Sequence, residues 1–116
     1  MSKFTIYHNP RCSKSRQTLE LLRANGVEPS VIEYLKTPPK AKELKQVIEL
    51  LGVAPQDVMR KKEAEYKESG LDDLTLTASE QIKRMVANPK VIERPIVFSD
   101  KKAVVGRPPE NVLDII

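Results

Sequence analysis

The chain has 116 residues, 40% hydrophobic and 31% charged, which predicts one soluble globular domain with its own core. There are 20 Lys and Arg against 16 Asp and Glu, and the net charge of +4 favours anionic partners. Only 4% of residues are aromatic, which speaks against a nucleic-acid-binding protein. The sequence contains no bilayer-spanning apolar run and does not start like a secretory signal, so we expect a cytoplasmic protein without membrane association.

A strand-helix-strand unit is predicted in the first third of the chain. Residues 3–7 (KFTIY) alternate apolar and polar positions as a strand does, and the Asn-Pro pair that follows ends it. A helix is expected over about 13–25, with Gly26 as the residue after its cap, and the segment 30–34 (SVIEY) is rich in strand formers. Two strands joined by a helix at this spacing indicate a parallel, right-handed crossover.

The middle of the chain, from about residue 40 to about residue 90, is predicted to be a helical insertion. A glycine at position 52 closes one helix, whose apolar residues recur at helical spacing: Leu44, Val47, Ile48 and Leu51. A short helix can begin at Pro55 and end near Arg60. The sequence TASE at 77–80 fits a capping box before a further helix, which ends before Pro89.

The last part of the chain predicts a β-hairpin and a short helix. The segments 95–99 (PIVFS) and 103–106 (AVVG) are rich in strand formers and are separated by a charged turn. Pro108 and Pro109 can begin the final helix. The whole order therefore predicts an α/β fold, with a βαβ unit, a helical insertion, a hairpin and a helix.

Cys12 is the only cysteine, and it lies at the predicted N-terminus of the first helix. Unpaired backbone N–H groups and the helix dipole stabilise a thiolate there, and Arg11, Lys14 and Arg16 add positive charge. Most unpaired cysteines are buried and behave as small hydrophobes, but every neighbour within 10–17 is polar or a helix breaker, which favours a nucleophile. The chain can form no internal disulfide, so any second sulfur must come from another molecule.

His8 and Ser15 are candidates for supporting this nucleophile. His8, the only histidine, follows the first strand and can hold a charge or a proton beside the thiolate; the alternative is a polar residue without a chemical role. Ser15 stands where a C-x-x-C pair has its second cysteine. Its hydroxyl can donate a hydrogen bond to the thiolate but cannot resolve a disulfide.

Two Arg-Pro pairs, Arg94-Pro95 and Arg107-Pro108, provide candidate anion ligands. A residue before proline is restricted to extended backbone angles, so each arginine is held on a stiff segment. The guanidinium fork binds oxyanions in a bidentate way, although a solvated surface arginine is the alternative for each. Arg60 does not differ from its neighbours on sequence alone.

Five segments resemble the arsenate reductases of the ArsC family that use glutathione and glutaredoxin: YHNPRCSKSR, EYLKTPP, RKKE, ERPIVF and GRPPENVLDI. The resemblance runs from Thr5 to about Ile115, and its specificity lies in the H-N-P-x-C-x-x-S-R segment combined with two Arg-Pro motifs. It implies a thioredoxin-like, glutaredoxin-like fold with a helical insertion. It also implies that the bond before Pro95 is cis and that this proline packs near the cysteine.

The resemblance further implies the role of each site residue. Cys12 attacks arsenate to form an adduct, His8 helps to keep it ionised, and Ser15 matches a hydroxyl residue of the same loop. Three arginines hold the oxyanion: Arg60, Arg94 and Arg107. The resemblance implies no bound metal or cofactor, with glutathione as a co-substrate and glutaredoxin as the partner. It also implies a monomer in the cytoplasm with a role in arsenical resistance.

The chain departs from the plasmid-type members in two respects. Those members have a longer C-terminal tail, so this chain resembles a short form, and Arg11 and Lys14 stand here in place of smaller residues. Two other functions stay open at this point. One is a glutathione-dependent thiol reductase that removes glutathione from proteins; the other is a regulator that binds RNA polymerase, as the related Spx-type proteins do.

Overall fold

The computed structural model describes residues 3–116, which divide into two compact units. The first unit contains the chain up to Thr37 together with Arg94–Ile116, and the second is Pro38–Glu93. The second unit nearly coincides with the predicted helical insertion. Met1 and Ser2 lie outside the described residues, and a single domain over 1–116 stays a prediction. Among residues 3–116, no helix has the length and apolar character needed to cross a membrane.

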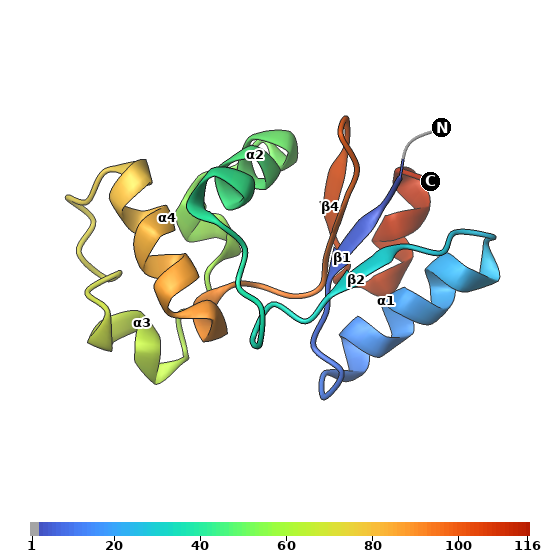
Figure 1. The fold of residues 1–116 in the computed structure, drawn as a ribbon. Coiled ribbons are helices and arrows are strands. Elements are labelled where there is room, and N and C mark those ends of the chain that lie inside the picture. The colour runs from blue at the N-terminus through green and yellow to red at the C-terminus, as the bar shows by residue number, and fades with distance from the viewer. Residues whose placement is uncertain (1–2) are drawn as a thin grey trace. The chain divides into compact units, whose positions relative to one another are not determined.

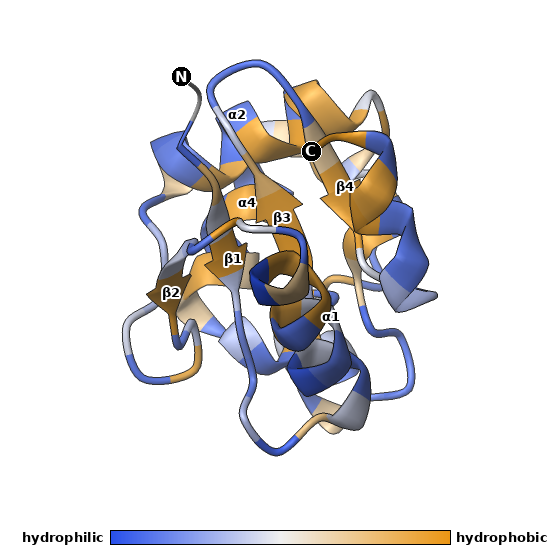
Figure 2. Ribbon diagram, turned by 90° about the vertical axis from the view of Figure 1, so that its right-hand side faces the viewer, coloured by the Kyte–Doolittle hydropathy of each residue, from blue (hydrophilic) through white to orange (hydrophobic). Residues whose placement is uncertain are grey.

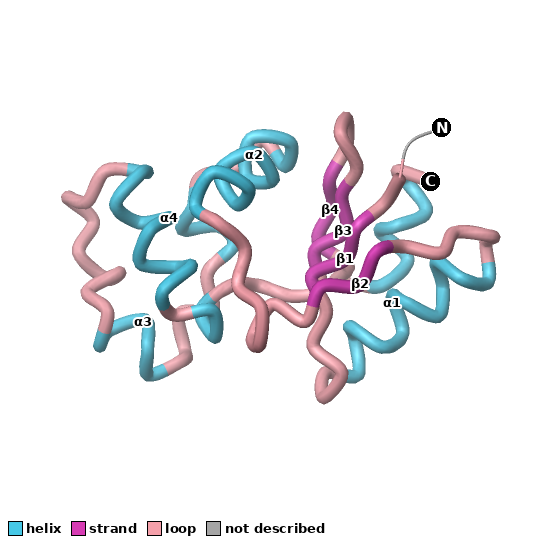
Figure 3. Tube along the Cα trace, in the orientation of Figure 1, coloured by secondary structure: helices cyan, strands magenta, loops and turns pink. Residues whose placement is uncertain are grey.

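A four-stranded sheet in the order β2-β1-β3-β4 forms the centre of the first unit (Figure 3). The elements of this unit are β1 (Thr5–Tyr7), α1 (Ser13–Ala24), β2 (Ser30–Ile32), β3 (Ile96–Phe98), β4 (Ala103–Val105) and the 3₁₀ helix η3 (Pro109–Asp114). Strand β1 pairs in parallel with β2 and antiparallel with β3, and β3 pairs antiparallel with β4. The predicted parallel crossover and hairpin are both confirmed, and with them the thioredoxin-like α/β fold.

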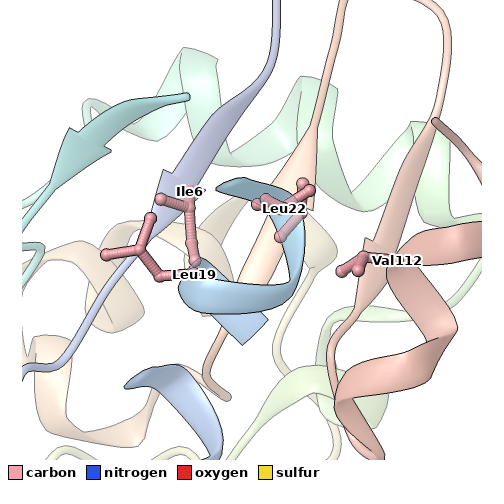
Figure 4. Close-up of a cluster of buried hydrophobic side chains, with 5 residues drawn as sticks. Ile6, Leu19, Leu22 and Val112 are labelled. Carbon is pink, nitrogen blue, oxygen red and sulfur yellow. The ribbon is translucent and has the colours of Figure 1, made fainter. Parts of the chain in front are cut away.

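The core of the first unit lies between the sheet and the two helices α1 and η3, which pack against each other (Figure 1). Five buried side chains from these elements form one cluster (Figure 4): Ile6, Leu19, Leu22, Val97 and Val112. Figure 2 shows the hydrophobic residues concentrated on the central strands, while much of α1 is hydrophilic. Burial of each such side chain contributes about 1.5–3 kcal/mol, so this cluster anchors α1 on the sheet.

Helix α1 begins and ends close to the predicted positions. Cys12 is its N-cap residue, with extended backbone angles. At the other end, the N–H of Val27 donates to the carbonyl of Leu22 at 2.9 Å, and the N–H of Gly26 donates to that of Arg23 at 3.1 Å. These two bonds form a Schellman motif, and the φ of +78° at Gly26 is the left-handed conformation that glycine adopts without strain.

The second unit is helical. Its elements are α2 (Ala41–Leu51), η1 (Pro55–Val58), α3 (Ala64–Glu68), α4 (Ala78–Ala87) and η2 (Pro89–Val91). Helices α2 and α4 pack on each other through their buried apolar faces. The helices predicted around 44–51 and after the TASE segment are confirmed, whereas η1 ends at Val58, before the expected position near Arg60.

Candidate active site

Cys12 lies in a short loop between β1 and α1, where its side chain is partly buried. Its N–H donates to the carbonyl of Asn9 at 3.0 Å, and its carbonyl accepts the N–H of Arg16 at 3.0 Å. The loop is closed further by Arg16, whose Nη1 donates to the carbonyl of Pro10 at 2.8 Å. These bonds fix the backbone of the loop at Cys12.

The surroundings of Cys12 lower the pKa of its thiol, although burial alone would raise it. The backbone N–H groups of Ser15 and Lys14, together with the positive charges of Arg94 and Arg107, act in the lowering direction. These N–H groups belong to the first turn of α1, where the helix dipole also favours a negative charge. Cys12 is thus biased toward the thiolate, the nucleophilic form.

Arg107 provides the direct contact to the sulfur. Its Nη2 lies 3.4 Å from the Sγ of Cys12, and its Nε donates to the carbonyl of Arg94 at 2.7 Å. Arg107 is exposed, whereas Arg94 is partly buried. Arg107 therefore lies at the sulfur of Cys12 and is bonded to the backbone of Arg94; the role of these two arginines as anion ligands stays a prediction.

Pro95 follows Arg94 and is buried in the first unit. The Arg94–Pro95 bond is cis, which confirms the expectation from the resemblance. The Arg107–Pro108 bond is cis as well, and the sequence did not predict it. The carbonyl of Pro95 accepts the N–H of Gly106 at 2.9 Å, which places the two Arg-Pro segments side by side; the packing of Pro95 against Cys12 stays a prediction.

His8 and Ser15 form a buried pair. The Nδ1 of His8 lies 2.6 Å from the Oγ of Ser15, which also accepts the N–H of Asn9 at 3.0 Å. Burial lowers the pKa of His8; Glu33 opposes this effect, while Arg23 and Arg16 reinforce it. Because the Asn9 N–H already donates to Ser15, the hydroxyl proton can be directed to the Nδ1 of a neutral imidazole.

This arrangement differs from the roles predicted for the two residues. We expected the Ser15 hydroxyl to donate to the thiolate, but it is bonded to His8, and the backbone N–H of Ser15 is the group that favours the thiolate. We also expected His8 to hold a charge or a proton beside the sulfur. Burial lowers the pKa of His8, which favours its neutral form bonded to Ser15, and the support of the thiolate by His8 stays a prediction.

Comparison with known proteins decides the family of the chain. The model of the ArsC family matches residues 7–115. The chain belongs to the ArsC family. This ArsC-family chain is 45% identical over 113 residues to "Arsenate reductase" of Neisseria meningitidis serogroup A, covering 97% of each chain. It is 54% identical over 112 residues to "Uncharacterized protein YfgD" of Escherichia coli K12, covering 96% of this chain and 94% of that one.

A solved structure shares the fold of this ArsC-family chain over nearly its whole length. The arsenate reductase from Vibrio cholerae superimposes with a TM-score of 0.93 at 47% sequence identity, covering 99% of this chain and 98% of the other. The α/β fold described above is therefore that of its ArsC relatives.

Arg60, the third arginine implied by the ArsC resemblance, lies in the second unit. Its backbone N–H donates to the carbonyl of Val91 at 2.7 Å, and its guanidinium forms an ion pair with Glu63. Both side chains of this pair are about one-third exposed, at 31% and 30%. The role of Arg60 as an oxyanion ligand stays a prediction.

A pocket of about 290 Å³ lies on the first unit of this ArsC-family chain. Its lining combines the active-site loop with the segment after β2: His8, Asn9, Pro10, Arg11, Glu33, Leu35 and Lys36. The pocket thus adjoins the loop that carries Cys12 and contains charges of both signs. Among residues 3–116, no three His, Cys, Asp or Glu side chains gather in a way that could hold a metal ion.

Two residues at this site were missed by sequence reasoning. Asn9 was interpreted only as a chain breaker, yet its carbonyl accepts the Cys12 N–H and its Oδ1 accepts the N–H of Arg11 at 3.0 Å. Its position just before a proline and three residues before the cysteine is compatible with such a turn. Thr18 is fully buried on α1 and contacts Gly106, which no local pattern indicates.

Proposed function

We propose that this protein reduces arsenate to arsenite through a covalent adduct on Cys12, with glutathione and glutaredoxin as electron donors. The observation that carries the proposal is the 3.4 Å approach of the Arg107 Nη2 to the Cys12 Sγ, at a thiol whose pKa is lowered. A guanidinium beside a thiolate is the arrangement that brings an oxyanion to a sulfur nucleophile. The names of the Neisseria and Vibrio relatives support arsenate as that oxyanion.

The first step forms a sulfur–arsenic bond. The Cys12 thiolate attacks the arsenic atom and an arsenate oxygen leaves, protonated, as water; the arsenic is still in its +5 state in this adduct. Arg94 and Arg107 neutralise the charge on the remaining oxygens, which would otherwise repel the approaching thiolate. A lowered pKa of Cys12 is useful here because the thiolate, and not the thiol, is the nucleophile.

The second step must bring both electrons from other molecules. Arsenate needs two electrons to become arsenite, and the chain contains one cysteine, so it cannot form an internal disulfide after the reduction. Glutathione attacks the arsenic of the adduct and displaces a second oxygen as water. The glutaredoxin thiolate then attacks the glutathione sulfur, and the arsenic–sulfur bond breaks with its electron pair left on arsenic, so that two thiols become one mixed disulfide. Water hydrolyses the remaining bond between Cys12 and arsenic, which releases arsenite and regenerates Cys12 with a net formation of one water per arsenate.

A coupled assay tests this function directly. Oxidation of NADPH is followed with glutathione, glutathione reductase and glutaredoxin, with and without arsenate, for the wild type and for Cys12→Ser. We expect an arsenate-dependent rate that Cys12→Ser lowers by about 100-fold or more, since the variant lacks the nucleophile. A wild-type rate no higher than that of Cys12→Ser refutes the proposal, and activity on a glutathionylated peptide alone would assign a thiol reductase instead.

A further inference from the structure

We propose that Thr18 and Gly106 form a positioning pair that holds Arg107 against the Cys12 sulfur. Thr18 lies on α1 and is fully buried. Its Oγ1 donates to the carbonyl of Lys14 at 2.8 Å and lies 3.3 Å from the carbonyl oxygen of Gly106. The hydroxyl thus lies between the first turn of α1, which directly follows Cys12, and the residue directly before Arg107.

A glycine is required at position 106 because there is no room for a side chain between Thr18 and Pro95. A Cβ at this position would lie 2.7 Å from the Oγ1 of Thr18, 2.9 Å from the Cγ of Pro95 and 3.0 Å from the Cγ2 of Thr18. Gly106 is not among the glycines with a positive φ, which are Gly26, Gly52 and Gly70. Its backbone conformation is therefore one that residues other than glycine can adopt. Neither neighbour can move aside easily, because one is a proline ring and the other a hydrogen-bonded, β-branched side chain.

Arg107 is held from two directions by this arrangement. On one side, the N–H of Gly106 donates to the carbonyl of Pro95 at 2.9 Å, while the Nε of Arg107 donates to the carbonyl of Arg94 at 2.7 Å. On the other, Gly106 rests against Thr18 on α1. These contacts fix the position of the Arg107 guanidinium at the N-terminus of α1, where its Nη2 lies 3.4 Å from the Sγ of Cys12.

Thr18 and Gly106 are positioning residues, since they act on the sulfur through Arg107. Displacing the Gly106–Arg107 segment would withdraw one of the positive charges that lower the pKa of Cys12. The expected change in the thiolate is independent of any substrate, whereas its consequence for arsenate reduction rests on the proposed function. The two claims can therefore fail separately.

A double-mutant cycle tests the pair. The rate of Cys12 alkylation by iodoacetamide is measured against pH for the wild type, Gly106→Ala, Arg107→Ala and the variant with both changes. We expect Gly106→Ala to move the profile to higher pH and to slow alkylation on its acidic limb about threefold, the size expected for one exposed charge. In the Arg107→Ala background the same change should have no further effect.

A second pair of variants covers the case in which Gly106→Ala disturbs folding. Thr18→Val keeps the shape of the side chain and removes the hydroxyl, so it should shift the profile in the same direction. Thr18→Ser keeps the hydroxyl and should retain the wild-type profile. The thermal midpoint of each variant is measured alongside, so that a general loss of structure is recognised.

Two results would overturn the inference. One is an unchanged alkylation profile in both Gly106→Ala and Thr18→Val. The other is an effect of Gly106→Ala that persists in full without Arg107, since the two changes would then act independently. Neither measurement contains arsenate, so a negative result here leaves the proposed reaction untouched, and a missing arsenate reductase activity leaves the positioning pair untouched.

Discussion

Opposing influences act on the ionisation of Cys12. Burial disfavours the charged sulfur, while two backbone N–H groups and two guanidiniums favour it, and their combined effect prevails. The contribution of Arg107 depends on a single contact of 3.4 Å made by an exposed side chain. The ionisation of the Cys12 sulfur is thus favoured by a few fixed dipoles and charges.

His8 should make the stability of the protein depend on acidification. Its pKa is lowered in the folded chain, mainly by burial, so the unfolded chain binds the proton more tightly. The contribution of neutral His8 to the free energy of unfolding is complete above the ordinary pKa of about 6.5. It is lost as the pH falls through the pKa of the folded chain. The loss cannot exceed about 1.4 kcal/mol per pH unit, the limit for one proton.

Urea unfolding at pH 7.5 and pH 5.5 measures this effect, with His8→Asn as the comparison. Asparagine keeps an acceptor for the Ser15 hydroxyl but does not titrate in this range. The free energy of unfolding of the wild type should fall more on acidification than that of His8→Asn. Equal losses in both proteins would show that His8 does not stay neutral in the folded chain.

At the scale of the elements, helix ends determine much of the local structure. The N-terminus of α1 provides the N–H groups that face Cys12, and its C-terminus is closed by the Schellman motif at Gly26. In the second unit, Thr77 is the N-cap of α4, and its Oγ1 accepts the N–H of Glu80 at 3.1 Å. Such caps are local, so their sequence signals are readable without the fold.

Removal of the α4 cap should destabilise the protein measurably. In Thr77→Ala the N–H of Glu80 loses its acceptor, and we expect the free energy of unfolding to fall by about 1 kcal/mol. Thr77→Ser keeps the oxygen and serves as the control, with a change of less than half that size. Equal stability of all three proteins in urea unfolding would contradict the assigned cap.

The elements that the sequence predicted are those with a strong local pattern. Alternation identified β1, and apolar spacing with a closing glycine identified α2. The five-residue helix α3 was missed because Tyr66 is its one buried side chain, which leaves no periodicity to detect. The end of η1 was placed too late, since a 3₁₀ turn of four residues follows no apolar repeat.

At the scale of the whole molecule, the candidate site depends on segments far apart in the sequence. Cys12 and Arg107 are 95 residues apart, and they meet because the end of β1 and the end of β4 lie level across β3, where Tyr7 pairs with Ile96 and Ile96 with Val105. Residue chemistry predicted a thiolate and anion ligands, and the resemblance supplied the cis bond before Pro95. No local pattern could predict that the Ser15 hydroxyl pairs with His8, or that Thr18 packs on Gly106.

The pH dependence of Cys12 alkylation, with and without arsenate, tests the central claim most directly. We predict a midpoint below the value of about 8.5 for an ordinary cysteine, and saturable protection by arsenate that chloride at equal ionic strength does not give. The N–H groups of Ser15 and Lys14 and the two arginines are the physical reason for the low midpoint, and the arginines are the reason for protection by arsenate. A midpoint at or above the ordinary value, or alkylation that arsenate does not slow, would contradict a thiolate held within an oxyanion site.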